Sequence, residues 1–528
     1  SGRLAAVEAN YAYGDLMCEC ELATVQDVTR SIIKGNARTV DDIRRDVRLG
    51  MGPCQGGFCT FRVAGLLQKL RQPPVVDTNA ALRDFLQERW KGLMPVLWGQ
   101  QMRQERLDEL IYLSILNTDH LPGPAGTSLG PIMYQRPSLE VPEERRKSAL
   151  EFELSQRQAS PPMRPPASSG VRNFDTVVVG AGLSGLTAAW QLSSRGERVR
   201  VVAKGWGANY WHAGCVDVLG YYPTDQTEPL ASPRQGLEKL IRAEHPYSLA
   251  GIDIIQEALE AFKDLCNQSG YPMHGTLDKN WLLPTSAGGI RPTCLAPETM
   301  VAGDVRSLEP VLIVGFQGYA DFYADLIAAN LSVQGIPAKG VTISLPFIQN
   351  RTFSYHRELA WMFENPDYRA EIAAAVRPHL AGAVKVGFPA VLGINQPMIV
   401  LHDLEAQLGM PVFEIPTLPA SVPGIRLTNL LLRAIEASGS RVYDAMQAVA
   451  SEIQNDRIVN VLTEAAARRK SHRAQKYLLA TGGILGGGIV TSADGKVREV
   501  IADLPISAPT NRIDWVESQF LTPRGQPI

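Results

Sequence analysis

Long apolar runs are missing from this sequence of 528 residues. No stretch approaches the roughly 18 uninterrupted apolar residues that a membrane-spanning helix needs, so no segment is expected to cross a bilayer. A charge excess is missing as well, because 52 Lys and Arg face 54 Asp and Glu, for a net charge of -2. This balance gives no basic surface for nucleic acid or an anionic membrane. The 45% hydrophobic and 20% charged residues are typical of a globular protein with about three to four domains.

Cysteine is also scarce, but its distribution is uneven. Four of the seven cysteines lie in the first 59 residues, as Cys18-Glu-Cys20 and Cys54-Gln-Gly-Gly-Phe-Cys59. Thiolates at such close spacing converge on a soft metal or an iron–sulfur cluster. The clustering favours a reducing cytoplasm over a secreted disulfide scaffold.

The spacing of these four cysteines favours an iron–sulfur cluster over zinc. Zinc pairs usually stand two to four residues apart, and Cys-x-Cys is less usual there. The loop from Gly52 to Cys59 is rich in glycine, so its backbone N–H groups can reach sulfide or thiolate. We therefore predict a [2Fe-2S] cluster on Cys18, Cys20, Cys54 and Cys59, with zinc and disulfides as the alternatives. The remaining cysteines are expected to be small buried hydrophobes: Cys215, Cys266 and Cys294.

The segment around the cysteines is expected to be a small all-α domain. Thr24 and Thr39 each precede an aspartate by three residues, a variant of the capping box that begins a helix. These two helices are expected to end at Lys34 and Gly50, and a third to run from about 56 to 69. The first cysteine pair would then lie in the loop before the first helix. The second pair would lie at the start of the third helix, where the helix N-terminus favours thiolate.

Composition divides the chain into four parts. Residues 1–75 form the cysteine domain, and 76–120 continue as a helical extension that Gly92 and Pro95 interrupt. Nine prolines fall between 121 and 170, which predicts a stiff, extended linker over 121–171. Residues 172–528 form the last and largest part. Helical spacing in the extension predicts four core residues: Leu107, Leu110, Ile111 and Ile115.

The largest part opens with a dinucleotide-type phosphate loop. A strand at 175–179 leads into Gly180-Ala-Gly182-Leu-Ser-Gly185, then a helix to about 194 and a second strand at 199–203. In such a loop the first glycine permits the tight turn, the second admits phosphate, and the third allows close helix packing. This βαβ pattern predicts an α/β, Rossmann-like flavoprotein domain. A later strand before Thr481, Gly482 and Gly483 is placed where many flavoproteins return to the nucleotide domain.

One expected residue is absent from this pattern. An acidic residue usually ends the second strand and binds the ribose hydroxyls, but Lys204 stands here, and the nearest acid, Glu197, precedes the strand. A lysine cannot accept hydrogen bonds. The substitution leaves room for FMN, for FAD bound in an atypical way, or for a 2′-phosphate partner.

Other polar residues give weaker signals. His212 follows the second strand and is either structural or close to a flavin. Arg426 follows a proline-rich turn and is either an anion ligand or one member of a surface salt bridge. His245 has no partner that the sequence identifies. No catalytic acid or base is assigned.

Two stretches together resemble a known enzyme. The cysteine region resembles the bacterioferritin-associated-ferredoxin-like (BFD-like) [2Fe-2S] domain, and its continuation from Phe85 to Gly99 is similar to the C-terminal part of the A subunit of anaerobic glycerol-3-phosphate dehydrogenase. Residues from about 173 onward are similar to the B subunit of that enzyme. The segments that carry this similarity include Val314-Gly-Phe-Gln-Gly-Tyr-Ala-Asp-Phe322 and Pro416-Thr-Leu-Pro-Ala-Ser-Val-Pro-Gly-Ile-Arg426.

The resemblance implies a function as part of a complex. That enzyme oxidises sn-glycerol 3-phosphate to dihydroxyacetone phosphate and delivers electrons to quinone in anaerobic respiration. The implied cofactors are a [2Fe-2S] cluster and FMN, with FAD possible, and Lys204 is counted among the implied flavin-binding residues. The implied partners are a dehydrogenase domain or subunit that carries FAD, and an iron–sulfur protein that links the complex to the membrane. The expected location is cytoplasmic, peripheral on the inner face of the cell membrane.

The resemblance also implies a fusion of the tail of the A subunit with the B subunit. The FAD-binding dehydrogenase domain expected before Ser1 and the last B-subunit segment expected after Ile528 are both missing, so we expect a chain truncated at both ends. Two other functions remain open. One is a [2Fe-2S]/flavin component of an amine- or opine-type dehydrogenase, and the other is a non-enzymatic, zinc-stapled interaction scaffold.

Overall fold

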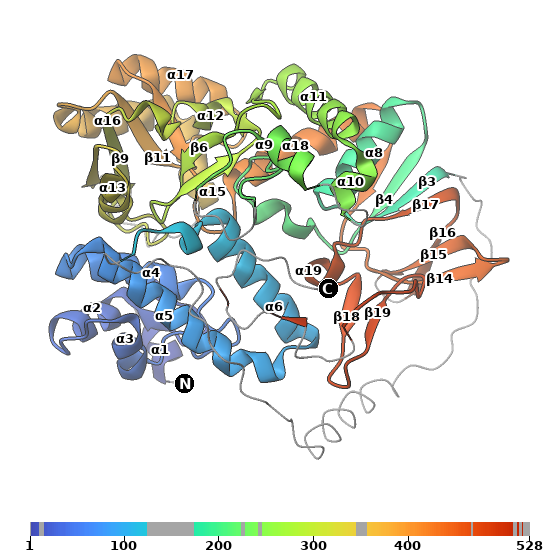
Figure 1. The fold of residues 1–528 in the computed structure, drawn as a ribbon, viewed down its shortest axis with the longest axis horizontal. Coiled ribbons are helices and arrows are strands. Elements are labelled where there is room, and N and C mark those ends of the chain that lie inside the picture. Colours follow the sequence, from blue (N-terminus) through green and yellow to red (C-terminus); the bar gives the residue numbers. More distant parts are fainter. Residues whose placement is uncertain are drawn as a thin grey trace.

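A computed structural model shows how these segments are arranged (Figure 1). The structure describes residues 2–9, 15–123, 174–222, 228–240, 245–344, 356–465, 468–509, 515–516 and 520. The predicted linker over 121–171 lies almost wholly outside these residues. Among the helices of the described part, none is both long enough and apolar enough to cross a membrane.

The N-terminal unit is mostly helical and is drawn in blue in Figure 1. Its elements in chain order are α1 (Gly2–Ala9), β1 (Leu16–Cys18), β2 (Ala23–Thr24), α2 (Val25–Ile33), α3 (Val40–Val47), α4 (Cys59–Arg71), α5 (Val75–Leu93), η2 (Met94–Val96), α6 (Gly99–Glu109), η3 (Leu110–Ile115) and η4 (Thr118–His120).

Local signals in this unit were informative but not complete. Both capping boxes are confirmed, since Thr24 and Thr39 each accept the N3 amide while the N3 aspartate accepts the cap amide. The second helix ends at Val47 rather than Gly50, because Arg48 already adopts a left-handed conformation with φ of 64°. The third helix begins at Cys59 rather than near 56.

Three further expectations for this unit can be compared with the structure, and one of them is fully confirmed. The all-α prediction missed the short antiparallel pair β1–β2, so Cys18 ends a strand instead of lying in a loop. The break near Gly92 and Pro95 is confirmed by the change from α5 to η2. Of the four predicted core residues in the extension, Ile111 and Ile115 are buried, whereas Leu107 and Leu110 are half-buried.

The first large sheet follows the predicted βαβ pattern. Its strands are all parallel in the order β13-β4-β3-β17. They are β3 (Phe174–Val179), β4 (Val199–Val202), β13 (Arg441–Tyr443) and β17 (Ala474–Leu479). Two of the helices that contact it are α8 (Leu183–Ser194) and α18 (Val422–Ala437). The late strand therefore does return beside the first strand, as the sequence predicts.

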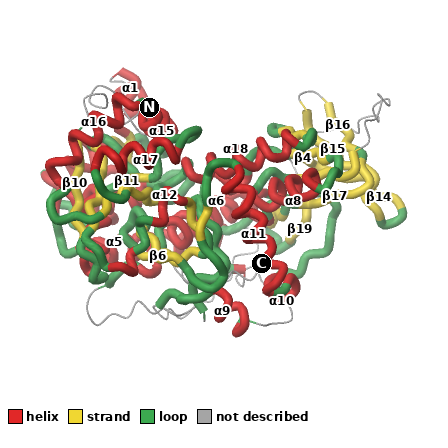
Figure 2. Tube along the Cα trace, turned by 90° about the horizontal axis from the view of Figure 1, so that it is seen from above, coloured by secondary structure: helices red, strands yellow, loops and turns green. Residues whose placement is uncertain are grey.

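A second parallel sheet was not predicted. Its order is β10-β9-β11-β12, and Figure 2 shows it at the opposite end of the molecule from the first sheet. Its strands and helices are β9 (Val311–Phe316), α13 (Ala324–Val333), β10 (Ala338–Ile343), α15 (His356–Glu364), α16 (Pro366–Val376), η7 (Arg377–His379), β11 (Lys385–Pro389), α17 (Pro397–Leu408) and β12 (Val412–Ile415). All residues of β9, β11 and β12 are buried, as in a sheet covered on both faces.

The remaining elements complete the described part of the chain. Those that lie between β4 and β9 in the sequence are η5 (Gly207–Tyr210), α9 (Pro233–Lys239), α10 (Pro246–Ala250), α11 (Ile252–Gln268), β5 (Met273–His274), β6 (Trp281–Pro284), β7 (Ile290–Thr293), β8 (Ala296–Pro297), α12 (Glu298–Val301) and η6 (Val305–Ser307). Those near the C-terminus are β14 (Ala448–Gln454), β15 (Arg457–Ala465), β16 (Arg468–His472), α19 (Gly483–Gly486), β18 (Ile489–Thr491) and β19 (Val497–Glu499).

The N-terminal unit shares its core with the rest of the chain. One apolar cluster joins Phe61 and Trp90 of this unit to Leu326 of α13, Leu418 before α18 and Ile484 of α19. Burial of apolar side chains is the main stabilising contribution in such a contact. The cysteine segment is therefore packed firmly against the larger segment that follows it in the chain.

Candidate functional site

The ends of three parallel strands form the edge where the predicted site lies. Gly180 follows β3, Lys204 follows β4 and Thr481 follows β17. Backbone hydrogen bonds tie the three ends together, from Gly180 N to Val202 O (2.9 Å) and from Ala480 N to Val179 O (2.8 Å). This carboxyl edge is where open α/β sheets bind their ligands.

The three glycines of the loop have the geometry that the motif predicts. Gly180 has φ of +113°, and a β-carbon there would lie 2.1 Å from Ala480 O. A β-carbon on Gly185 would lie 2.0 Å from Gly180 O, so only glycine allows helix α8 to approach this closely. At Gly182 a β-carbon would meet nothing within 4 Å, so this position faces open space. These residues remain predicted phosphate ligands on a suitable backbone.

The first turn of α8 has the donors that a phosphate needs. Gly182 is the N-cap and supplies no side-chain hydrogen bond. Helix N-termini with free N–H groups and a positive dipole end bind anions. The second glycine turn closes the same edge, with φ of +76° at Gly482 and +56° at Gly483. The Thr481 hydroxyl does not face the glycine turn, since it packs against the backbone at Gly488.

Lys204 borders a cavity of about 290 Å³ at this edge. Arg103 of α6 and Arg498 of β19 also line it, and no carboxylate is among the lining residues that the structure describes. Arg103 is oriented by a hydrogen bond to Leu485 O (3.3 Å). The cavity is thus positive. Its wall is formed by α6 of the N-terminal unit, by Lys204 after β4, and by β14, β18 and β19.

Glu197 cannot replace the missing ribose acid. It stands before β4, at the other end of the strand, as the sequence indicates. Its carboxylate binds Lys476 Nζ and Thr176 Oγ1, both at 2.6 Å. The lysine at the ribose position is therefore a real departure from the usual pattern.

The four predicted metal ligands lie on two loops that face each other. Cys18 ends β1, Cys20 lies in the following turn, Cys54 lies in the turn before α4, and Cys59 begins α4. All four are free thiols. The Sγ atoms of Cys20 and Cys54 are 3.6 Å apart, and Cys18 shares a hydrogen bond with Cys59. Each cysteine of the first loop is thus paired with one of the second.

The two pairs differ in their electrostatics. The hydrogen bond from Cys59 lowers the pKa of Cys18 to about 6, and the same bond together with burial raises the pKa of Cys59. Burial raises the pKa of Cys54 to about 12. In the described part of the chain, no three His, Cys, Asp or Glu side chains are grouped so as to hold one metal ion. Two separate thiol pairs suit a two-iron cluster, in which two protein ligands bind each iron.

The backbone around the thiols is shaped for close approach. A β-carbon on Gly52 would lie 2.2 Å from the Cys20 β-carbon, so only glycine fits between the two loops. Gly56 has φ of +100°, and its carbonyl accepts from Thr60 Oγ1 (2.7 Å) and Tyr112 Oη (3.2 Å). The four thiols and their loops therefore fit a Cys₄ iron–sulfur cluster.

Comparison with known families gives two matches. Residues 16–69 match the BFD-like [2Fe-2S] binding domain, which spans all four clustered cysteines. Residues 175–525 match the FAD binding domain, which covers the glycine loop and both large sheets. The chain thus carries an FAD-binding domain with a [2Fe-2S] binding domain N-terminal to it.

Curated relatives narrow the family further. The probable anaerobic glycerol-3-phosphate dehydrogenase B subunit of Halobacterium salinarum is 34% identical over 354 residues, which are 65% of this chain and 82% of that protein. The chain belongs to the family of anaerobic glycerol-3-phosphate dehydrogenase B subunits. The B subunit of Pectobacterium atrosepticum is 29% identical over 365 residues, covering 66% of this chain and 84% of the relative.

Solved structures are more distant than these B subunits. The 3-ketosteroid-Δ4-(5α)-dehydrogenase from Rhodococcus jostii RHA1 covers 60% of this chain and 48% of its own at 14% identity, with a TM-score of 0.27. The L-proline dehydrogenase from P. horikoshii covers 58% and 53% at 14% identity, with a TM-score of 0.23. Structural similarity with TM-scores this low adds nothing to the family assignment.

His212 of this B-subunit family member has a neutral ring. Its Nδ1 accepts from Gly214 N at 2.8 Å, and burial lowers the pKa of His212 to about 4. His245 does have a partner, since it caps α10 by accepting from Tyr247 N at 3.1 Å. Both histidines therefore have a structural hydrogen bond that the sequence did not reveal.

The prediction for Arg426 was wrong in both of its forms. Arg426 lies on α18 with only 3% of its surface exposed, and it pairs with the equally buried Glu414 at 2.6 and 2.8 Å. It also donates to Gly393 O (2.8 Å) and Tyr271 Oη (3.2 Å). Its hydrogen-bonding capacity is used inside the protein, so Arg426 is neither a surface residue nor an anion ligand. The three lone cysteines are buried, as predicted: Cys215, Cys266 and Cys294.

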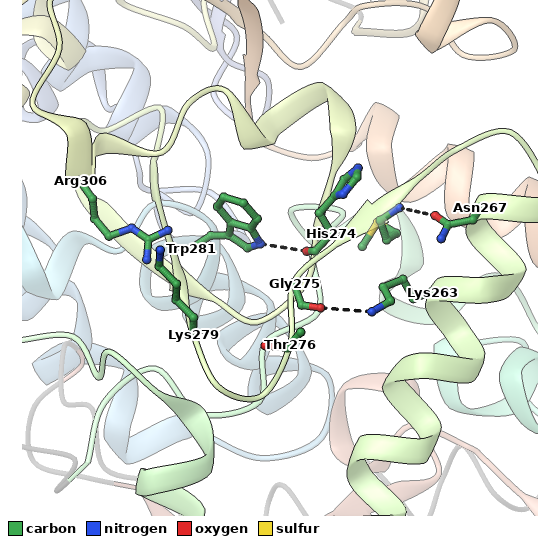
Figure 3. Close-up of a pocket in the computed structure, with 9 residues that line it drawn as sticks. Lys263, Asn267, His274, Gly275, Thr276, Lys279, Trp281 and Arg306 are labelled. Atoms are coloured by element: carbon green, nitrogen blue, oxygen red, sulfur yellow. Dashed lines mark hydrogen bonds between the residues drawn. The ribbon is translucent and has the colours of Figure 1, made fainter.

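A second cavity of about 390 Å³ lies beside Trp281, between the end of α11 and β5–β6 (Figure 3). Its cations are mostly neutralised: Lys263 pairs with Glu260, and Arg306 pairs with Asp304. The Trp281 indole donates to His274 O at 2.9 Å, which fixes the wall of the cavity. This charge-balanced cavity is remote from the glycine loop in sequence and gives no further functional assignment.

Sequence reasoning missed buried polar residues beside the cysteines. Burial raises the pKa of Asp108 on α6 to about 8, and its carboxylate fills the space where Gly57 lacks a side chain. Arg62, one turn after Cys59, pairs with the buried Asp321 in the loop after β9. The partners are 259 residues apart, so no local pattern could have joined them.

Proposed function

We propose that this chain is the flavin- and iron–sulfur-carrying component of an anaerobic glycerol-3-phosphate dehydrogenase. The complex oxidises sn-glycerol 3-phosphate to dihydroxyacetone phosphate and passes the electrons to quinone. Membership of the B-subunit family carries the substrate assignment. The structural observation that supports an electron-carrying role is the packing of the paired thiols against the same flavoprotein unit that carries the glycine loop.

The proposed iron–sulfur ligands are Cys18, Cys20, Cys54 and Cys59. When bound, a [2Fe-2S] cluster supplies one-electron redox chemistry, while the protein tunes its potential by charge, hydrogen bonds and exposure. The pairing of thiols across two loops and the glycines beside them support this ligand set. A single zinc ion would instead require all four thiols around one centre.

The proposed flavin ligands are the backbone groups of two glycine turns: Gly180, Gly182, Gly185, Thr481, Gly482 and Gly483. We further propose FAD rather than FMN. The cavity at Lys204 lies at the end of β4, where a Rossmann-type fold holds the adenosine half of a dinucleotide. FMN has no adenosine half and would leave this cavity without a use. Lys204 would then meet phosphate or ribose as a hydrogen-bond donor.

The finer organisation of the complex is part of the proposal. The N-terminal unit corresponds to the tail of the A subunit, fused to a B subunit, with boundaries near 75, 120 and 171. Separate proteins would supply the FAD-carrying dehydrogenase site and the iron–sulfur link to the membrane. The complex would lie on the cytoplasmic face of the cell membrane. No residue of this chain is proposed as the catalytic acid or base.

Spectroscopy and cofactor analysis test this proposal directly. Anaerobically purified chain is expected to show broad visible bands that dithionite bleaches, and about two irons per chain, as four thiolates on a two-iron cluster require. Flavin released by denaturation should be FAD. A Cys54→Ser variant should lose the iron signal and keep the flavin, whereas Cys266→Ser should keep both. A colourless, zinc-containing protein would contradict the electron-transfer role.

Turnover tests the substrate. The chain assembled with its partner subunits should reduce an artificial acceptor when sn-glycerol 3-phosphate is added. Amines, opines and amino acids should not support reduction. Turnover with one of these in place of glycerol 3-phosphate would assign the chain to a different dehydrogenase class while leaving the cofactors unchanged.

A further inference from the structure

One guanidinium group connects the cysteine loop to the flavoprotein unit. Arg62 lies on α4, one turn after Cys59, and only 8% of its side chain is exposed. Its Nε and Nη2 atoms donate to the two carboxylate oxygens of Asp321, at 2.5 and 3.3 Å. Asp321 itself is 3% exposed. A two-pronged pair of this kind is geometrically specific and strong.

The same guanidinium is also bound from the cysteine side. Its Nη1 atom donates to Glu19 Oε1 at 3.0 Å, and Glu19 is the residue between Cys18 and Cys20. Arg62 therefore bridges the first thiol loop and Asp321 while it lies on the helix that begins at the last thiol.

A second contact joins the two units next to this bridge. The Phe58 ring, immediately before Cys59, packs on Trp211 with ring centroids 6.1 Å apart. Trp211 follows η5, where Asn209 donates to Ala181 O in the glycine loop at 3.0 Å. The cysteine loop is thus connected through two aromatic rings to the segment that supports the predicted flavin phosphate site.

The far side of Asp321 is closed by polar groups of the flavoprotein unit. His356 Nε2 lies 3.5 Å from Asp321 Oδ2, and Tyr319 Oη bonds His356 Nδ1. The only described full positive charge paired with Asp321 is that of Arg62, because burial lowers the pKa of His356 and keeps its ring neutral. Removing Arg62 would leave the Asp321 carboxylate buried without a compensating charge, whereas removing Asp321 would leave Arg62 with only the exposed Glu19 carboxylate.

We propose that Arg62 is a positioning residue that fixes the [2Fe-2S] cluster against the flavoprotein unit, and that the Arg62–Asp321 pair sets the reduction potential of that cluster. This rests on the proposed function, because it requires a cluster on the four cysteines. Reduction adds negative charge to the cluster, so a nearby buried cation favours it and a nearby buried anion opposes it.

The test is an EPR-monitored redox titration of the full chain, loaded anaerobically with iron and sulfide. Arg62→Gln should lower the midpoint potential, because a positive charge is lost. Asp321→Asn should raise it, because a negative charge is lost. Arg62→Lys keeps the charge and should stay close to the parent potential. Arg45→Gln removes an arginine that is 70% exposed on α3, and it should leave the potential unchanged.

The directions in which Arg62→Gln and Asp321→Asn shift the midpoint potential distinguish the proposal from a purely structural role. If Arg62 only held the two units together, both buried variants would expose the cluster to water and shift its potential in the same direction. Shifts in one direction, or no shift, would therefore overturn the proposal. If Arg62→Gln does not fold, Arg62→Lys and Asp321→Asn carry the test, and a midpoint potential that does not rise in Asp321→Asn would overturn the proposal.

The same titration distinguishes this proposal from the proposed function. A parent chain that takes up no iron would overturn both. A parent chain that holds two irons, but whose potential does not respond to Arg62 or Asp321, would overturn only the role of the pair.

Discussion

Asn79 and Asn330 exchange hydrogen bonds across the boundary between the two units. Asn79 Nδ2 donates to Asn330 Oδ1 at 2.7 Å, and Asn330 Nδ2 donates back to Asn79 Oδ1 at 3.2 Å. Both side chains are essentially buried, one on α5 and the other on α13. Each amide satisfies the other in a place that water does not reach, which makes the contact specific as well as stabilising.

The two members of this amide pair should be energetically coupled. Asn330→Leu leaves Asn79 buried with a lost partner, which should lower the free energy of unfolding by about 1–3 kcal/mol. The double variant Asn79→Leu/Asn330→Leu should lose less than the sum of the two single variants, although Pro122 O and Ala287 O each lose a donor as well. Urea denaturation of the three variants measures the coupling between the two residues. Additive losses would show that the pair is not coupled.

The Arg426–Glu414 pair gives a second stability prediction. Arg426→Leu leaves the Glu414 carboxylate buried without its cation, and such a loss costs about 3–5 kcal/mol. The matched control is Arg45→Ala, which removes an exposed ion pair to Asp41 and should cost less than about 1 kcal/mol. Denaturant midpoints of both variants measure the difference. Equal losses of stability in the two variants would mean that burial does not determine how much an ion pair stabilises this protein.

Two alanine substitutions in the glycine loop should have different consequences. Gly182→Ala meets nothing in the protein, so folding should be unaffected, while the methyl group blocks phosphate and weakens flavin binding by about tenfold or more. Gly185→Ala collides with Gly180 O and should lower the melting temperature of the flavin-free chain as well. Flavin fluorescence titration and thermal unfolding measure the two effects. Normal flavin binding by Gly182→Ala would contradict the phosphate site.

His472 predicts a loss of stability in acid. The ring lies on β16 and is neutral, since Arg200 donates to its Nδ1 (3.3 Å) and its Nε2 donates to Thr463 Oγ1 (2.9 Å). Burial, followed by the charges of Arg200 and Lys470, lowers the pKa of His472 from 6.5 to about 4. Between these two values the unfolded chain binds the proton more readily than the folded chain, so stability falls as the pH falls from about 6.5 to 4.

The size of this effect can be measured with one variant. A shift from 6.5 to about 4 corresponds to about 3 kcal/mol once the pH is below 4. His472→Gln removes one titrating group and should make this part of the pH profile less steep, although it costs stability at pH 7. The slope that remains belongs to other buried groups such as His212, whose pKa burial also lowers to about 4. Urea unfolding at several pH values follows both proteins. Parallel profiles would show that another group causes the acid sensitivity.

Patterns that act over a few residues were the most predictable. The hydroxyl and carboxylate spacing at Thr24 and Thr39 specified two helix starts, because a capping box is satisfied entirely within one turn. The glycine loop specified a strand, a turn and a helix for the same reason. The return of the late strand to a place beside β3 was also predicted, because a strand that runs into a glycine turn stands here where many flavoproteins return to the nucleotide domain.

Contacts between distant segments were not predictable from one sequence. Arg62 and Asp321 carry no pattern that links them. Arg426 was predicted to be an anion ligand or one member of a surface salt bridge, because its buried partner Glu414 lies on a different element. The second parallel sheet was missed because short apolar runs that are buried on both faces do not reveal which strands pair. The positive cavity at Lys204 combines α6, β4 and β19, so only the folded chain reveals it.

The shared core described above implies that the covalent connection between the two units is not what keeps them together. Phe61 and Trp90 belong to the same apolar cluster as Leu326 and Ile484. A chain cut once between Leu121 and Phe174 should therefore migrate as a single species on a sizing column. The connection instead raises the effective concentration of each unit around the other. For two proteins that already recognise each other, the proposed fusion would bring this same advantage.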